Sequence, residues 1–209
     1  ACKACGIRPL AYGAVYAATK DTFKAHPEWG MYTMDAQPMT FAGWLYYMNV
    51  APSCGWAEHI VEEFRSAVRF GFSGIHMDTY GFPKRVWDAQ HRPVELADEF
   101  PRLINAAARA VREETPDGGV IFNAVNNWPT ETIARAAQDA VYIEVWPPHD
   151  TYFDLYRLIR EARLLSHRNV ILAAYLKAFQ VGDALAAERS FRLAWAVISA
   201  SGGTQLVLG

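Results

Sequence analysis

Short apolar runs rich in Val, Ile, Tyr and Phe alternate with amphipathic stretches along this chain of 209 residues. Alternation of this kind is typical of βαβ units, which form a parallel sheet covered by helices. The strand candidates are Leu10–Tyr16, Trp44–Asn49, Gly74–Asp78, Val120–Val125, Val141–Trp146, Val170–Tyr175 and Thr204–Leu208. Turn residues bound most of these runs, so we expect each to be a separate strand.

Helical periodicity marks most of the segments between these strands. In Trp56–Phe70, apolar residues recur at Ile60, Val61, Phe64 and Val68, close to a period of 3.6 residues. The helices expected on this basis, or from their end signals, are Trp56–Phe70, Val94–Glu114, Thr130–Gln138, Thr151–Ser166 and Ala184–Ser199. We therefore expect a helix after each main strand except the last.

The number of strands indicates an incomplete barrel. No clear helix separates Trp44–Asn49 from Leu10–Tyr16, so we assign it to a loop or an extra hairpin. Six strands remain, whereas a closed barrel has eight. An open doubly wound sheet is an alternative, but no glycine-rich phosphate loop follows any strand. We predict one α/β domain over residues 1–209, a (β/α)8 TIM-barrel type with about six of its eight βα units and its first two strands absent.

Composition excludes some classes of function. The net charge is -2 and no basic stretch is present, which argues against a nucleic-acid partner. No apolar run reaches the roughly 18 residues that a membrane span needs. The chain begins Ala1-Cys2-Lys3 without a signal-peptide pattern, so we expect further residues to precede it.

The cysteines do not complete a metal site. Cys2 and Cys5 have the spacing of a redox or zinc pair, and Cys54 is the third cysteine. No second cysteine pair or closely spaced histidine pair accompanies them. We therefore expect no metal, and we leave the role of Cys2 and Cys5 open.

Two carboxylates lie in apolar strands near the end where barrel enzymes carry their active sites. Asp78 ends Gly74–Asp78, and Glu144 lies inside Val141–Trp146. A buried carboxylate costs free energy unless it is paired or used. An ion pair or a hydrogen-bonded core carboxylate would explain one such residue, whereas two on separate strands favour catalysis.

Residues two positions apart in a strand share a face. His76 therefore accompanies Asp78, where it could bind a sugar hydroxyl, orient Asp78 or fill the barrel interior. Tyr142 and Trp146 accompany Glu144. Their rings would reduce its hydration, and a less polar environment favours the neutral acid that a general acid needs.

A third polar strand end contains Asn123 and Asn126. Asparagine donates and accepts hydrogen bonds, which suits sugar hydroxyls, but it is also common in turns. We assign Asn123 to ligand binding and leave both possibilities for Asn126. Serine-hydrolase and zinc-protease chemistry lack support, because neither Gly-x-Ser-x-Gly nor His-Glu-x-x-His occurs.

These segments resemble glycoside hydrolase family 66, which contains endo-dextranases and cycloisomaltooligosaccharide glucanotransferases. The segment 70–81 (FGFSGIHMDTYG) is similar to the family's nucleophile segment. Residues 123–126 (NAVN) and 141–147 (VYIEVWP) resemble its next two strand ends, and 201–208 (SGGTQLVL) resembles its last barrel strand. The resemblance covers nearly the whole chain in the same order.

The resemblance implies a retaining hydrolase of α-1,6-glucans such as dextran and isomaltooligosaccharides, without a cofactor and secreted or on the cell surface. Asp78 would be the nucleophile and Glu144 the acid/base. Tyr80 lies two residues after Asp78. The candidate substrate-binding residues are therefore His76, Tyr80, Asn123, Asn126, Tyr142 and Trp146. The two carboxyl groups should lie about 5–5.5 Å apart with Asn123 between them. A cyclising glucanotransferase and a non-catalytic carbohydrate-binding barrel remain as alternatives.

Overall fold

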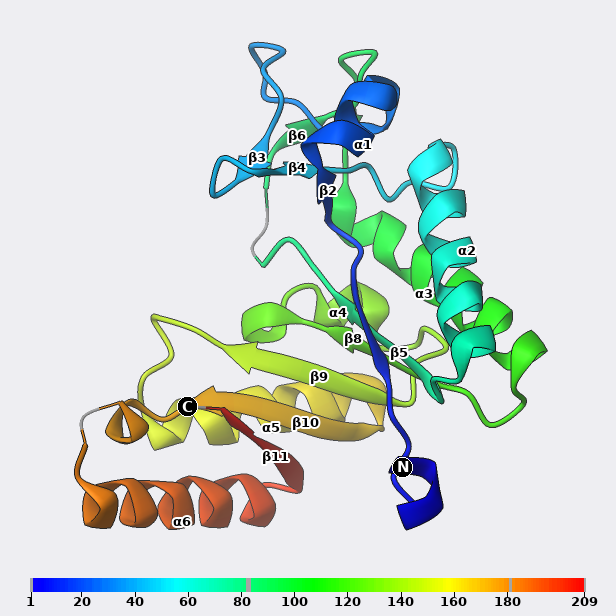
Figure 1. Ribbon diagram of the computed structural model, residues 1–209. Coiled ribbons are helices and arrows are strands. Elements are labelled where there is room, and N and C mark those ends of the chain that lie inside the picture. Colours follow the sequence, from blue (N-terminus) through cyan, green and yellow to red (C-terminus); the bar gives the residue numbers. More distant parts are fainter. Residues whose placement is uncertain (1, 82–83, 181, 209) are drawn as a thin grey trace.

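A parallel six-stranded sheet forms the centre of the computed structural model, which describes residues 2–81, 84–180 and 182–208 (Figure 1). The strand order follows the sequence, β1-β5-β8-β9-β10-β11, and every neighbouring pair is parallel. The strands are β1 (Ala11–Ala14), β5 (Gly74–Asp78), β8 (Gly119–Asn123), β9 (Ala140–Val145), β10 (Asn169–Tyr175) and β11 (Gly203–Leu208). All six predicted sheet strands are thus confirmed, and their carboxyl ends lie at one edge.

Five helices follow one another around the outside of this sheet, each packed on the next. They are α2 (Gly55–Phe70), α3 (Leu96–Glu114), α4 (Thr130–Ile133), α5 (Tyr152–Ser166) and α6 (Ala184–Ala200). A short helix α1 (Lys20–Ala25) and four 3₁₀ turns, η1 (Cys2–Cys5), η2 (Pro27–Trp29), η3 (Val125–Asn127) and η4 (Lys177–Phe179), complete the helical elements among the described residues. Strand and helix thus alternate as predicted for a barrel.

The predicted helix Thr130–Gln138 is wrong beyond Ile133. Two side chains take the hydrogen bonds that a continuing helix would form. The Ile133 carbonyl accepts from the Gln138 side chain at 2.9 Å, and the Ala137 N–H donates to the Asn105 side chain at 2.8 Å. Capping of this kind competes with helix propagation and is not visible in a hydrophobic pattern.

The predicted strand Leu10–Tyr16 is two residues too long at its carboxyl end, because Val15 and Tyr16 form a turn. The large-sheet strand β1 ends at Ala14, and β2 (Ala17–Thr19) begins a three-stranded antiparallel sheet with β4 (Leu45–Tyr47) and β3 (Thr40–Phe41). The predicted extra strand Trp44–Asn49 contains β4 and lies outside the large sheet, as expected. Since β2 follows directly from the carboxyl end of β1, this small sheet stands over the carboxyl ends of the large sheet (Figure 1). A hairpin of β6 (Val86–Trp87) and β7 (Pro93–Val94) lies beside it.

Alternation along β5 explains why the large sheet has one apolar and one polar face. Ile75 and Met77 are fully buried against the helices, while His76 and Asp78 lie on the other face and are partly exposed. At the start of the strand, Gly74 (φ 154°) pairs with Gly119, and a Cβ at Gly74 would lie 1.9 Å from the Gly119 carbonyl oxygen. This close approach requires glycine and places both strands in register.

Candidate active site

Both predicted carboxylates lie at the carboxyl end of the large sheet, where barrel enzymes carry their chemistry. Asp78 is the last residue of β5, and Glu144 is the next-to-last residue of β9. Strand β8, which ends in Asn123, lies between them. The prediction that one strand separates the two carboxylates, with Asn123 on it, is therefore confirmed.

A continuous row of hydrogen bonds crosses five neighbouring strands at this end of the sheet. The Tyr12 hydroxyl on β1 donates to Asp78 Oδ2 at 2.5 Å, and the Tyr175 hydroxyl on β10 donates to Glu144 Oε1 at 2.5 Å. Asn123 Nδ2 donates to Asp78 Oδ1 at 2.8 Å and to Glu144 Oε2 at 3.0 Å. Every carboxylate oxygen of the pair therefore accepts one hydrogen bond from a side chain.

Protein atoms use all hydrogen-bonding groups of the Asn123 side chain. Its two amide hydrogens go to Asp78 and Glu144, and its Oδ1 accepts from the Glu144 backbone N–H at 3.3 Å. The Asn123 carbonyl accepts from the Thr79 hydroxyl at 3.0 Å. Asn123 is 2 % exposed, so its place between the carboxylates is fixed by burial as well as by hydrogen bonds.

The shared amide sets an upper limit on the separation of the two carboxylates. Asp78 Oδ1 and Glu144 Oε2 both bind the same nitrogen, so they can lie no further apart than the sum of 2.8 Å and 3.0 Å, about 5.8 Å. Both carboxylates face the polar side of the sheet and are partly buried. They can therefore act on neighbouring atoms of one bound molecule.

The two tyrosines remain hydrogen-bond donors over the physiological pH range. Burial, and then the hydrogen bond to Asp78, raise the pKa of Tyr12. Burial, and then the hydrogen bond to Glu144, raise the pKa of Tyr175 to about 12. Both hydroxyls therefore keep their protons near neutral pH and can donate to the carboxylate oxygens beside them.

His76 lies two residues before Asp78 on β5, between the rings of Tyr12 and Tyr142. Its ring centroid is 5.9 Å from that of Tyr12 and 4.5 Å from that of Tyr142. Burial lowers the pKa of His76, and its Nε2 is buried without a hydrogen-bond partner. The structure therefore places His76 and Tyr142 in the barrel interior beneath Asp78 and Glu144.

A cavity of about 500 Å³ opens above the pair, at the carboxyl end of the sheet. The cavity wall includes Tyr16 and Tyr80, which are almost fully buried, and the Tyr80 hydroxyl donates to the Met48 carbonyl. The lining residues are Tyr16, Phe41, Tyr47, Asp78, Thr79, Tyr80, Gly81, Lys84, Val125, Glu144 and Trp146. Aromatic rings beside two carboxylates suit a ligand with apolar ring faces and many hydroxyls.

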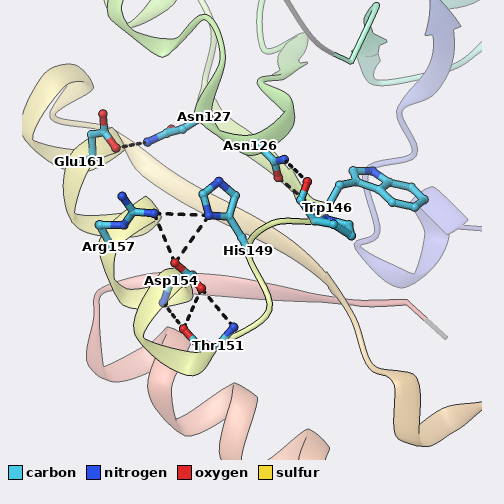
Figure 2. A network of polar contacts seen from close by, with 9 residues as sticks. Asn126, Asn127, Trp146, His149, Thr151, Asp154, Arg157 and Glu161 are labelled. Atoms are coloured by element: carbon cyan, nitrogen blue, oxygen red, sulfur yellow. Dashed lines mark hydrogen bonds and ion pairs between the residues drawn. The ribbon is translucent and has the colours of Figure 1, made fainter.

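Asn126 supports the loop after β9 (Figure 2). Its φ of 51° is left-handed, a conformation that asparagine tolerates. Its Oδ1 accepts from the Trp146 N–H at 2.7 Å, and its Nδ2 donates to the Pro147 carbonyl at 3.3 Å. Trp146 lies one residue beyond β9, with its ring centroid 4.9 Å from that of Tyr175. Of the two possibilities left for Asn126, the structure supports the turn.

Sequence reasoning missed Tyr12 and Tyr175 as members of the site. The alternation rule could have found Tyr12, because it lies in the first predicted strand. Tyr175 is the last residue of a strand predicted with the correct end, so the strand-end rule applied to Asp78 would also have selected it. The pairing order that joins each tyrosine to one carboxylate is not visible in the sequence.

None of the three cysteines lines the cavity above the carboxylates. Cys2 and Cys5 form the ends of η1 and are exposed free thiols, and Cys54 is a free thiol at the start of α2. Within residues 2–81, 84–180 and 182–208, no group of three His, Cys, Asp or Glu side chains could hold a metal ion. No helix in those ranges is long and apolar enough to cross a membrane.

Solved glycoside hydrolases of the TIM-barrel class share this fold. An α-galactosidase from Thermus thermophilus has this fold, with a TM-score of 0.60 at 16% identity over 98% of this chain and 47% of that one. A cycloisomaltooligosaccharide glucanotransferase from Paenibacillus, solved with cycloisomaltoheptaose, is more similar. It has a TM-score of 0.73 and 26% identity over 81% of this chain and 27% of that one.

Within this class, the chain belongs to glycosyl hydrolase family 66, whose model matches residues 1–209. A cycloisomaltooligosaccharide glucanotransferase from Niallia circulans is 28% identical over 197 residues, which is 86% of this chain and 20% of that protein. A dextranase from Streptococcus salivarius is 28% identical over 174 residues, 75% of this chain and 20% of that protein. The chain thus spans about a fifth of the length of these relatives.

Proposed function

We propose that this chain provides the catalytic centre of a retaining glycoside hydrolase that cleaves internal α-1,6-glucosidic bonds of dextran-type glucans. Asp78 is the nucleophile and Glu144 the general acid/base. The observation that carries the proposal is the amide of Asn123, which binds one oxygen of each carboxylate. The family supports the substrate class, and the geometry supports the mechanism.

The upper limit of about 5.8 Å between Asp78 Oδ1 and Glu144 Oε2 favours retention. Retaining glycosidases hold their carboxyl groups about 5–5.5 Å apart, because the nucleophile must reach the anomeric carbon while the acid reaches the adjacent oxygen. Inverting enzymes leave about 6.5–9.5 Å for a water molecule. The shared amide does not leave that space.

In the first step, an Asp78 oxygen attacks the anomeric carbon while Glu144 protonates the leaving oxygen. Asn123 and Tyr12 each donate to a different oxygen of Asp78, so each oxygen keeps a lone pair. In the second step, water attacks the glycosyl-enzyme and the bond to Asp78 breaks. The same two donors then stabilise the carboxylate that leaves.

Glu144 must carry a proton in the first step and accept one in the second. The Tyr175 hydroxyl suits both states, because a hydroxyl can donate to the carboxylate or rotate to accept from the acid. The amide of Asn123 only donates from Nδ2, so the Tyr175 hydroxyl is the partner of Glu144 that can adapt to both states.

A cyclising glucanotransferase is the second candidate, since relatives of that name match the chain. It would use the same carboxylates, and a sugar hydroxyl would replace water as the acceptor. A carbohydrate-binding barrel without catalysis has less support, because both carboxylates are present and fully hydrogen-bonded.

We also propose that residues 1–209 supply six of the eight βα units of one catalytic barrel, whose other strands pair with β1 and β11. The two edges of the sheet are the places where a barrel would close. A polymeric glucan cannot cross a membrane, so the enzyme would work outside the cell or on its surface.

Product analysis of the full-length protein on dextran and on starch tests this proposal. We expect linear isomaltooligosaccharides from dextran and no products from starch. Cyclic products from dextran would favour the glucanotransferase. Sugar binding without turnover would favour the non-catalytic barrel. Products from starch alone would contradict the proposed specificity for α-1,6-glucosidic bonds.

A further inference from the structure

A pocket of about 460 Å³, which we call the basic pocket, lies at the amino end of the large sheet, opposite the carboxylate pair. It lies between the carboxyl ends of α5 and α6, at the turn that leads from α6 into β11 (Figure 1). Strand β10 runs over seven residues from this end to Tyr175 beside Glu144, a distance of about 20 Å. A ligand in the basic pocket would therefore not touch the reacting groups.

Basic side chains dominate the lining of this pocket. Arg160, Arg163 and His167 have the spacing of three and four residues that places side chains on one face of a helix. The other lining residues are Leu164, Ala200, Ser201 and Gly202. None of the described lining residues is acidic. Like charges this close on a helix repel each other, and an anion between them would offset that repulsion.

The positive charge of the two arginines is not neutralised by a carboxylate. In the part of the chain that the structure describes, neither Arg160 nor Arg163 forms an ion pair with Asp or Glu. The Arg160 guanidinium lies over the ring of Tyr156, 5.8 Å from its centroid. By contrast, Arg192 on the neighbouring α6 pairs with Glu188 at 2.7 Å. The charge in the basic pocket is therefore available to a ligand.

The turn after α6 holds Arg163 in place. Its Nη1 donates to the Gly202 carbonyl at 2.5 Å. Gly202 has a φ of 83°, and a Cβ there would lie 2.5 Å from the same nitrogen, so glycine is required for the guanidinium to lie this close. The other N–H groups of Arg163 remain for a ligand. A guanidinium that is fixed before binding loses less freedom when an anion arrives.

The arginines supply more charge than the two helix ends need. Basic side chains are favoured there, because each helix carboxyl end carries a charge of about −0.5. The terminal carbonyls also have other donors: the Arg163 carbonyl accepts from the His167 N–H at 2.9 Å, and the Val197 carbonyl accepts from the Ser201 hydroxyl at 2.7 Å. The two ends contribute about −1, whereas the two arginines contribute about +2. The basic pocket therefore keeps a positive charge.

We propose that the basic pocket binds the phosphate group of a ligand other than the substrate. The planar fork of an arginine matches the oxygens of a phosphate, and two arginines can balance the nearly double charge that a phosphate group carries at neutral pH. The volume of about 460 Å³ lies in the usual range for small-molecule sites, so it also leaves room for the group that carries the phosphate. The proposal does not rest on the proposed function.

Calorimetry of the full-length protein with inorganic pyrophosphate tests this proposal. We expect saturable binding near neutral pH, and much weaker binding of acetate at the same ionic strength, because acetate carries a single charge. Arg160→Gln should weaken pyrophosphate binding about tenfold, or about 1.4 kcal/mol, as expected for one hydrogen bond to a charged group. Hydrogen exchange should slow in residues 163–168 and 200–203 when pyrophosphate is added.

Arg109→Gln is the matched control. Arg109 is exposed on α3, has no ion pair among the described residues, and its replacement removes the same charge from the protein. Pyrophosphate should bind to this variant as to the wild type. Equal weakening in Arg160→Gln and Arg109→Gln would show a general effect of charge and overturn the proposal. Absence of binding, or binding without slower exchange at the basic pocket, would also overturn it.

A phosphodiester polymer distinguishes two sources of the phosphate group. If the ligand is a free phosphate compound, poly(glycerol phosphate) should bind no more tightly per phosphate than pyrophosphate does. If the ligand is a polymer, poly(glycerol phosphate) should bind more tightly, and Arg160→Gln should weaken that binding as well. Polymer binding that Arg160→Gln leaves unchanged would contradict the proposal.

Dextran turnover separates this proposal from the proposed function. Both variants should turn over dextran within about twofold of the wild type, because neither residue lies near the carboxylates. If the wild type does not turn over dextran but binds pyrophosphate as described, the proposed function fails and the phosphate site stands. If dextran is hydrolysed and pyrophosphate does not bind, the phosphate site fails alone.

Discussion

The two carboxylates of the site have nearly the same hydrogen-bond partners but different surroundings. Each accepts from one tyrosine on an outer strand and from the shared Asn123. Beside Asp78, the cavity is closed by Tyr16 and Tyr80, which are almost fully buried beneath the small sheet. Beside Glu144, the partly exposed Trp146 separates this cavity from a second one of about 630 Å³.

This difference shows how one set of donors can serve two roles. The half around Asp78 is closed, which suits a group that must hold one sugar in a fixed position for covalent attack. The half around Glu144 opens to a second cavity, which suits a group that first releases one molecule and then admits another. The two carboxylates therefore differ more in how ligands can reach them than in the hydrogen bonds that they accept.

Replacement of the nucleophile should have the largest effect. Asp78→Asn removes the charged oxygen that attacks the anomeric carbon, so dextran turnover should fall by several orders of magnitude. Sugar binding, measured by calorimetry with isomaltotriose, should persist. Near-normal turnover in Asp78→Asn would show that the closed half does not hold the nucleophile.

Replacement of the acid/base should depend on the substrate. Glu144→Gln should reduce dextran turnover about 10²–10⁴-fold, because general acid catalysis contributes about that much. With a good leaving group, the first step needs little protonation and should lose far less. Azide, which needs no general base, should then restore part of the turnover. Equal losses on all substrates, without an effect of azide, would show that Glu144 is not the acid/base.

Asn123→Ala tests both halves together. It removes one charge-assisted hydrogen bond from each carboxylate, and each such bond contributes about 1.5–3 kcal/mol. We expect kcat to fall a hundredfold or more for good and poor leaving groups alike, since together the two bonds contribute at least about 3 kcal/mol. Asn169→Ala is the control, because Asn169 is exposed at the opposite end of β10. A loss confined to poor leaving groups would mean that Asn123 serves Glu144 alone.

The tyrosines should give the smallest effects. Tyr175→Phe should lower kcat about tenfold through loss of one hydrogen bond to a charged group. Tyr12→Phe should lower it by a similar factor, because its hydroxyl also donates one hydrogen bond to a charged carboxylate. The raised pKa of Tyr175, about 12, means that its donated hydrogen bond is present below that pH and is lost only above it. Any alkaline loss of activity below pH 10 should therefore persist in Tyr175→Phe.

Much of this arrangement could be predicted from the sequence. A short apolar run that ends in a carboxylate is a pattern that predicts a strand with a candidate catalytic residue. The prediction for Gly74–Asp78 has the observed bounds. Because sequential strands of a parallel sheet tend to pair in order, Asn123 could be placed between Asp78 and Glu144. Periodicity and strand order therefore located the site.

Side-chain contacts between distant segments could not be predicted in this way. The amide hydrogens of Asn123 suggested sugar binding in the sequence, whereas the structure directs both to the carboxylates. Tyr80 was expected to bind substrate, and its ring does line the cavity, but its hydroxyl binds the carbonyl of Met48, the residue after β4. Such partners depend on three-dimensional placement, which strand patterns do not contain.

Trapping of the glycosyl-enzyme is the most direct test of the central claim. The full-length protein would be treated with 5-fluoro-α-glucosyl fluoride, a substrate whose covalent intermediate breaks down slowly, and digested for peptide mass spectrometry. We predict one fluoroglucosyl adduct, located on Asp78 and absent from Asp78→Asn. An adduct on another residue, or turnover of dextran with inversion and no adduct, would contradict the account.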